Sequence, residues 1–232
     1  MTEAIREIAF DTETTGLDWG GDDRIIELGA VELINHIPTG NTFQAHINPG
    51  RAVSEATIRI TGITDEDLKD KPSFDDPSIV DAFLEFIGDA TLVAHNASFD
   101  RGFLNMELDR CGRSIIPEDR WIDTVAIARK RYPGAPANLD ALCRRYDISL
   151  ESRTYHGALL DSLLLAEVYL ELLGGRARAF DFGGPQGAAD QEHAAAKVRT
   201  ASLDSRITDE ERRAHSDFIG SLGENTLWAN YT

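Results

Sequence analysis

One short segment, IAFDTETTG at residues 8–16, constrains the fold of this chain more than any other. Its apolar start predicts a β-strand that ends in two carboxylates, Asp11 and Glu13. Side chains two apart on a strand point to the same face, so these carboxylates would lie side by side and repel each other. Either one takes up a proton or a hard divalent cation such as Mg²⁺ or Mn²⁺ lies between them. Taken alone, the pattern also fits an edge strand with solvated acids.

The length of 232 residues favours one domain followed by a tail. No apolar run approaches the roughly 18 residues that a membrane-spanning helix needs, and Glu3 and Glu7 stand where a signal peptide would be basic. We therefore expect a cytoplasmic protein without a membrane partner. Cys111 and Cys143 fit no disulfide or zinc pattern, so buried free thiols are expected.

The formal net charge of −17 opposes non-specific attraction to nucleic acid phosphates. If this protein acts on DNA or RNA, its charge must be offset. Bound metal would offset the charge locally, and a basic partner would offset it globally.

Apolar runs and turn residues predict strands first, and then helices that alternate with strands. The first three strands, at 5–10, 24–31 and 42–47, form an antiparallel meander because their connections are too short for crossover helices. Further strands are predicted at 91–95 and 121–124. Helices are predicted from about 54, at 64–68, at 78–87, at 138–146 and from about 158 to 173. Two more helices are predicted, one that Ser98 caps and one that follows the strand at 121–124 and ends at 129. This order predicts an α/β fold with a mixed sheet flanked by helices.

Two more acids and two histidines fall near these strand ends. Asp100 lies in the first turn of a helix just after a strand, where ligands gather in α/β sheets. Asp161 lies on the long helix, and His156 can face the same site only from the loop before that helix. Taken alone, His156 fits a loop histidine that bonds the backbone, whereas beside Asp161 it fits a shared site. His95 is interpreted as a capping or core histidine.

The composition changes after residue 175. Residues 176–199 are rich in Gly, Ala and charge without sustained periodicity, which predicts a flexible linker. Residues 200–232 regain helical signals, because Thr208 and Glu211 form a capping box. We expect a C-terminal helical tail there, with too little apolar surface to fold alone.

The acids recur within longer motifs, which are FDTETTG at 10–16, HNASFD at 95–100, and His156 with Asp161. This set resembles the 3′–5′ exonucleases of the DEDDh type over about the first 175 residues. The resemblance implies an exonuclease domain at 1–175 with an RNase H-like fold.

In this family four carboxylates hold two divalent cations, Mg²⁺ or Mn²⁺, one activating water and the other stabilising the leaving 3′ oxygen. The resemblance assigns metal binding to Asp11, Glu13, Asp100 and Asp161, and substrate binding to Asp11, Glu13, Asp161 and Thr61. It makes His156 the general base, for which an imidazole is well suited at neutral pH. One departure concerns Thr61, because the family commonly has histidine at that turn; a threonine can donate a hydrogen bond but offers no ring.

Further motifs make the chain most similar to the proofreading subunits of bacterial replicative DNA polymerases; they are IDT at 122–124, YPG at 132–134, LDALC at 139–143 and HGALLD at 156–161. This similarity implies action on mispaired, frayed or single-stranded DNA 3′ ends. It also implies that residues 200–232 dock onto the polymerase catalytic subunit. Relatives carry a sliding-clamp peptide near residues 176–182. Here the usual glutamine is missing. Phe180 and Phe182 fit either clamp binding or the end of the preceding helix.

Two alternatives stay open. A free-standing exoribonuclease with the same acids would need its own basic surface, and only scattered clusters such as RKR at 129–131 are present. A non-catalytic module that works through its tail would leave clustered carboxylates without a metal, which costs stability. A nuclease assay with and without EDTA separates these alternatives.

Overall fold

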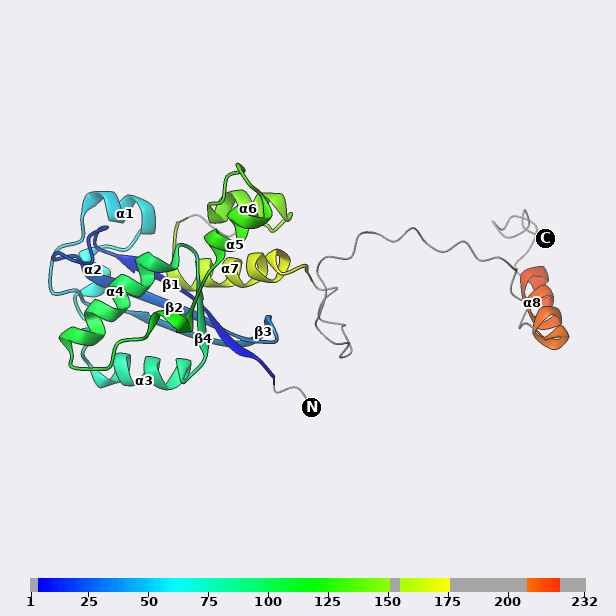
Figure 1. The fold of residues 1–232 in the computed structure, drawn as a ribbon, viewed down its shortest axis with the longest axis horizontal. Coiled ribbons are helices and arrows are strands. Elements are labelled where there is room, and N and C mark those ends of the chain that lie inside the picture. The colour runs from blue at the N-terminus through cyan, green and yellow to red at the C-terminus, as the bar shows by residue number, and fades with distance from the viewer. Residues whose placement is uncertain (1–3, 151–154, 176–207, 222–232) are drawn as a thin grey trace. The chain divides into compact units, whose positions relative to one another are not determined.

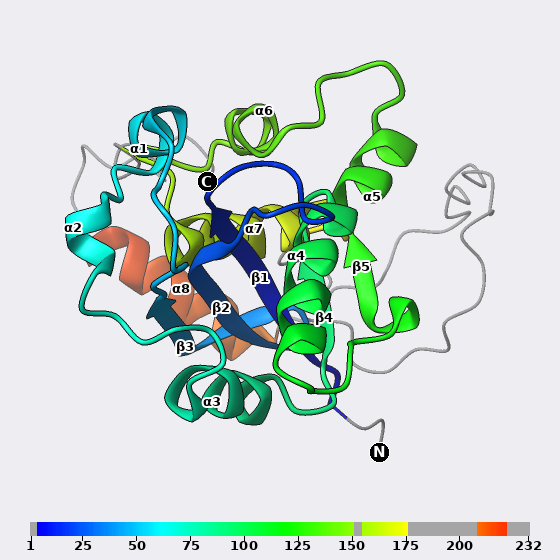
Figure 2. The same ribbon diagram turned by 90° about the vertical axis from the view of Figure 1, so that its left-hand side faces the viewer.

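The computed structural model describes residues 4–150, 155–175 and 208–221 of the chain. The chain divides into two compact units, Met1–Gly183 and Gly184–Thr232, which are described separately. The first unit contains a five-stranded sheet (Figure 1), and its strand order is β3-β2-β1-β4-β5 (Figure 2). None of the helices in the described ranges is long and apolar enough to cross a membrane.

The sheet is mixed, as predicted. Its strands are β1 Arg6–Thr14, β2 Ile25–Ile34, β3 Ile37–His46, β4 Thr91–Ala94 and β5 Trp121–Asp123. The first three are antiparallel, whereas β4 runs parallel to β1 and β5 runs parallel to β4. The prediction began β3 at residue 42, five residues late. Residues 37–41 of this edge strand are exposed and include Pro38 and Gly40, so no apolar alternation marks them.

The helices of the first unit are α1 Glu55–Thr61, α2 Asp65–Leu68, α3 Pro77–Ile87, α4 Ala97–Arg110, α5 Thr124–Arg131, α6 Leu139–Arg145 and α7 Ala158–Leu172, with a 3₁₀ turn at Glu118–Arg120. Ser54 caps α1, and Thr64 begins α2 with the predicted capping chemistry. The prediction that Ser98 caps α4 was wrong, since the helix begins at Ala97. Asn96 precedes it with φ of 69°, a left-handed conformation that asparagine tolerates.

Each face of the sheet is covered by its own helices (Figure 2). On one face, Ile8 and Phe10 of β1 pack in a core with residues of α3 and α4. On the other face, Ala9 packs in a core with residues of α5, α6 and α7. Because side chains alternate along a strand, β1 contributes to both cores. It is also the central strand of the sheet.

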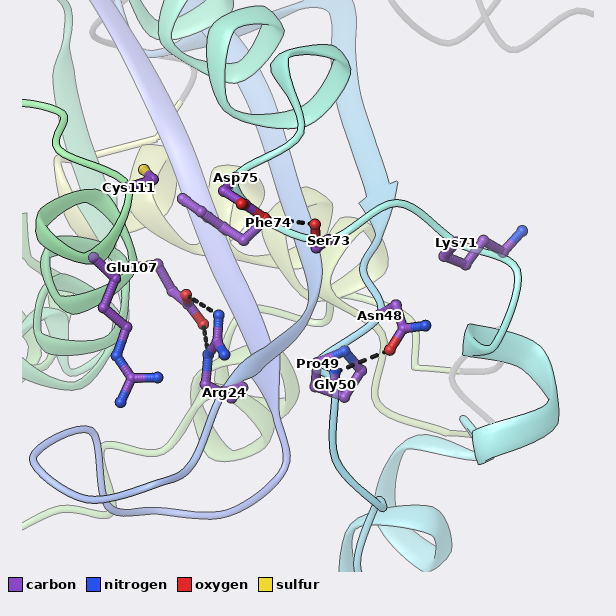
Figure 3. Close-up of a pocket in the computed structure, with 11 residues that line it drawn as sticks. Arg24, Asn48, Pro49, Gly50, Lys71, Ser73, Phe74, Asp75, Glu107 and Cys111 are labelled. Atoms are coloured by element: carbon purple, nitrogen blue, oxygen red, sulfur yellow. Dashed lines mark hydrogen bonds and ion pairs between the residues drawn. The ribbon is translucent and has the colours of Figure 1, made fainter.

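An ion pair ties α4 to the start of β2. The Arg24 guanidinium donates from Nε and Nη2 to the two carboxylate oxygens of Glu107, each at 2.7 Å (Figure 3). Glu107 is 1% exposed and also accepts the N–H of Ile25 at 3.3 Å. The carboxylate raises the pKa of Arg24, against the opposing effect of burial. This two-pronged contact fixes the register of α4 against the sheet.

In the second unit, the described residues form helix α8, Asp209–Ser221. The backbone N–H of Thr208 donates to the Glu211 carboxylate at 2.8 Å, and the Glu211 N–H donates to Thr208 Oγ1 at 3.2 Å. The predicted capping box is therefore present. The predicted linker at 176–199, the clamp segment at 176–182 and most of the remaining tail lie outside the described residues. The predicted domain limits stay predictions.

We predict that Arg24→Ala lowers the free energy of unfolding by about 3 kcal/mol, because it leaves the buried Glu107 carboxylate without its cation. Urea denaturation measures this change. Lys69→Ala is the matched control, since it removes the exposed Glu66–Lys69 pair and should cost less than about 1 kcal/mol. Equal losses in the two variants would show that the Arg24 pair does not hold α4.

Candidate active site

Strand β1 extends past its parallel neighbour. Its pairing with β4 runs from Glu7 opposite Thr91 to Ala9 opposite Val93, whereas its pairing with β2 continues to Thr14. Asp11 and Glu13 thus lie on the strand near its end, as the sequence predicted. Both are partly buried and alternate with Thr12, so they share the face on which Ala9 packs toward α7.

Asp100 lies beside β1 at the point where the pairing of β1 with β4 has ended. Its Oδ1 accepts the Thr12 N–H at 3.1 Å and the Thr12 hydroxyl at 2.9 Å, and the side chain is 2% exposed. Burial raises the pKa of Asp100 to about 7, although the Thr12 hydrogen bonds favour the ionised form. A divalent cation at this carboxylate would favour ionisation and replace the proton.

The start of α7 brings in the remaining residues. Asp161 lies in the first turn of α7 and is 4% exposed. His156 lies in the loop before the helix, as predicted, and its Nδ1 is 3.1 Å from Asp161 Oδ2. The backbone N–H of His156 donates to the carbonyl oxygen of Ile60 at 3.0 Å, and this bond connects the loop to α1.

Glu13, His156 and Asp161 form one group. A ligand atom of each lies within 4.8 Å of the others, so these three side chains could hold a metal ion. Asp11 is two residues before Glu13 on the same face of β1, and Asp100 bonds Thr12, which lies between them. Asp11 and Glu13 are thus on β1, Asp161 lies within 4.8 Å of Glu13, and Asp100 bonds Thr12. Carboxylate oxygens in this number suit Mg²⁺ or Mn²⁺.

Thr61 lies at the end of α1 and is 7% exposed. Its hydroxyl donates to the Thr57 carbonyl oxygen at 3.0 Å and accepts the Ile63 N–H at 3.1 Å, so backbone groups of its own turn hold it. It lines a pocket of about 450 Å³ together with Tyr155, the residue before His156. The one hydroxyl proton of Thr61 is thus donated within the turn, and the substrate contact stays a prediction.

His95 contacts α5. Its Nδ1 is 2.9 Å from Thr124 Oγ1, and burial lowers the pKa of the imidazole. This agrees with a core histidine next to the site. A second pocket, of about 590 Å³, is lined by Arg24, Glu107 and Arg110 among others, and none of the four acids lines it (Figure 3). It contains the ion pair of α4.

Two residues of β2 that face α7, Glu27 and Gly29, were not predicted to belong to the site. Glu27 is 2% exposed and accepts the Ala158 N–H at 2.9 Å. Gly29 lies so close to α7 that a Cβ on it would be 2.1 Å from the Ala158 carbonyl carbon. A buried acid within the apolar run at 24–31 was the available signal, but pairing it with a helix 131 residues later required the fold.

A mixed sheet flanked by helices, with four acids and a histidine around one strand, defines the class of 3′–5′ exonucleases of the DEDDh type. Two solved structures share the fold. Exonuclease X in complex with 5′ overhanging duplex DNA has a TM-score of 0.56 and 28% identity, and the match covers 73% of this chain and 90% of that one. The nuclease domain of 3′hExo, a DEDDh family member bound to rAMP, has a TM-score of 0.63 and 20% identity, with 74% and 93% covered.

Sequence comparisons define the family further. The exonuclease family model matches residues 8–169. The DNA polymerase III subunit epsilon of Rickettsia felis is 44% identical, with 94% of this chain and 97% of that protein covered. The corresponding subunit of Escherichia coli K12 is 40% identical, with 98% and 99% covered. The chain therefore belongs to the exonuclease family, and within it to the proofreading epsilon subunits of DNA polymerase III. It is a 3′–5′ exonuclease with an RNase H-like fold, and its family uses divalent metal ions.

We predict that Gly29→Ala lowers nuclease activity at least about 100-fold and also lowers the melting temperature. The new Cβ would meet the backbone of Ala158 and Leu159 at 2.1–2.2 Å, so the start of α7 must move and carry Asp161 with it. Gly20→Ala is the control, because its Cβ would meet only the Asp18 carboxylate at 3.4 Å. Activity assays and thermal unfolding of both variants measure the effect; a fully active Gly29→Ala would contradict it.

Proposed function

We propose that this chain is the proofreading subunit of a bacterial DNA polymerase III and removes mispaired 3′-terminal nucleotides from single-stranded or frayed DNA. The observation that carries the proposal is the grouping of Glu13, His156 and Asp161 within 4.8 Å, in a chain that matches epsilon subunits along nearly its whole length. The products are nucleoside monophosphates.

Asp11, Glu13, Asp100 and Asp161 would hold two divalent cations, Mg²⁺ or Mn²⁺. When bound, such ions acidify the attacking water and neutralise charge on the leaving 3′ oxygen. The four carboxylates come from β1, α4 and α7, so both helices must keep their places against the sheet for the set to be complete. The cations also offset the local negative charge, so the substrate phosphate meets a less repulsive surface.

His156 is the proposed general base. When Asp161 is ionised, Nδ1 of His156 is the protonated ring nitrogen, and it donates a hydrogen bond to Asp161 Oδ2 at 3.1 Å. The lone pair is then on Nε2, the nitrogen that can take a proton from the attacking water. The loop position of His156, with its side chain 49% exposed, allows the imidazole to reach a substrate. Thr61 is proposed to contact the 3′-terminal nucleotide of the substrate.

DNA is the proposed substrate because relatives that match at 40–44% identity are DNA polymerase III subunits. The likeness to 3′hExo, at 20% identity, supports the fold and not an RNA substrate. With a formal net charge of −17, the chain is poorly suited to bind DNA unaided. We propose that the polymerase catalytic subunit supplies phosphate contacts, that residues 200–232 dock onto it in the cytoplasm, and that residues 176–182 contribute a weak sliding-clamp contact.

Asp11→Ala is expected to abolish metal-dependent 3′–5′ hydrolysis, because the remaining acids cannot complete the cation site. The measurement is product analysis on a 5′-labelled single-stranded oligonucleotide with Mg²⁺ or Mn²⁺, and with EDTA. Degradation that survives chelation, or that starts from the 5′ end, would overturn the proposed function. Asp140→Ala, on the exposed surface of α6, is the matched control and should leave hydrolysis unchanged.

His156→Ala is expected to slow hydrolysis about 10²- to 10⁴-fold near neutral pH, which is the usual contribution of a general base. Metal affinity should change little, since the role assigned to His156 is proton uptake. Single-turnover rates and calorimetric metal titration measure the two quantities separately. A large loss of metal affinity would instead make His156 a ligand, as its place beside Glu13 and Asp161 also allows.

Deletion of every residue after Gly187 is expected to leave hydrolysis of short single strands intact and to abolish co-purification with the polymerase catalytic subunit. Tethering raises the effective concentration of the nuclease near a primer end without new contacts at its active site. Pull-down and nuclease assays on the full chain and the truncated chain test both expectations. A truncated chain that still binds the polymerase would show that the tail is not the docking segment.

A further inference from the structure

Glu27 is a buried carboxylate that the hydrolysis described above does not use. It lies on β2 directly opposite Glu13 of β1, and it is 2% exposed. Its Oε2 accepts the Ala158 N–H at 2.9 Å and its Oε1 accepts from Gln44 Nε2 at 2.7 Å, with His46 Nε2 3.8 Å away. A carboxylate at this depth is costly unless its oxygens are bonded. Both oxygens of Glu27 are bonded.

The bond to Ala158 lies at the beginning of α7. The first N–H groups of a helix have no partner within the helix, and the N-cap residue of α7, Gly157, has no side chain to supply one. Glu27 supplies that acceptor from the neighbouring strand. Its negative charge also lies at the positive end of the helix dipole. The capping group of α7 is thus fixed to the sheet and not to the loop.

Two further contacts hold the same turn against β2. Ser162 Oγ donates to the Gly29 carbonyl oxygen at 2.9 Å, and the missing side chain of Gly29 lets Ala158 approach. Glu27 bonds Ala158, which is two residues after His156 in the chain. The Asp161 N–H then bonds the Gly157 carbonyl oxygen at 2.8 Å, so the orientation of that turn determines where Asp161 points.

We propose that Glu27 is a positioning residue for the hydrolysis: it holds the start of α7 so that His156 and Asp161 face Glu13. The proposal rests on the proposed function. Glu27 touches neither the substrate nor the reacting atoms. Gln44 of β3 holds the carboxylate from the other side, so the edge strand also contributes to the placement of the proposed general base.

Three substitutions separate position from charge. Glu27→Gln keeps an oxygen that can accept the Ala158 N–H, and the Gln44 amide can rotate to accept from the new amide group. Glu27→Asp keeps the charge but is one methylene shorter, so it cannot reach Ala158 without movement of the backbone. Glu27→Ala removes both. Glu32→Ala is the matched control, since Glu32 is on the same strand and bonds Arg6, Thr39 and Asn41 away from α7.

The experiment measures kcat and KM of the full chain on a single-stranded DNA oligonucleotide at saturating Mn²⁺, with thermal unfolding of each variant. Misplacement of a reacting group by about 1 Å costs on the order of 100-fold. We expect Glu27→Ala to lower kcat by about 10- to 100-fold with KM within about twofold. Glu27→Gln should stay within about threefold of the wild type, and Glu32→Ala should lose stability alone.

Two results would overturn the proposal. One is a Glu27→Ala variant with wild-type kcat, and the other is a Glu27→Gln variant as slow as Glu27→Ala, which would assign the effect to charge. If Glu27→Ala does not fold, the comparison of Glu27→Asp with Glu27→Gln decides, because positioning requires Gln to be the faster of the two. A wild-type chain without metal-dependent hydrolysis would instead refute the proposed function.

Discussion

The unequal pairing of β1 is the constraint on which the rest of the site depends. Its parallel partner β4 ends at Ala94, so the Thr12 N–H on that edge would be buried without an acceptor. Asp100 accepts it at 3.1 Å. One carboxylate thus completes the backbone bonding of the strand and stands beside the acids that the strand carries.

The two helices that carry the other acids lie on opposite faces of the sheet, and separate contacts hold each of them. The Arg24–Glu107 ion pair fixes α4 to the start of β2, whereas Glu27 and Gly29 fix the start of α7 to the middle of that strand. Strand β2 is therefore the common support of both helices, although it contributes none of the four acids. The two sets of contacts share no residue, so we expect their contributions to stability to be additive.

Much of this site was predictable from local patterns. The two-residue spacing of Asp11 and Glu13 indicated a shared face, and Gly157 indicated that His156 lies in a loop. The predictions that were wrong, and the residue that was missed, depended on contacts that leave no local pattern in the sequence. The left-handed turn at Asn96 moved the start of α4 to Ala97, and the length of β1 depended on its pairing with β2. The role of Glu27 depends on a contact between residues 131 positions apart.

The bond between Asp100 and Thr12 has a calorimetric consequence. With a pKa of about 7, the Asp100 carboxyl holds a proton in a large share of molecules at neutral pH before any cation arrives. A cation bound there, as proposed, would release that proton to the buffer, and the measured heat would include the enthalpy of protonation of the buffer. The heat of metal binding near pH 7 would therefore differ between a buffer such as phosphate and one such as Tris, and the slope of that dependence would give the number of protons released.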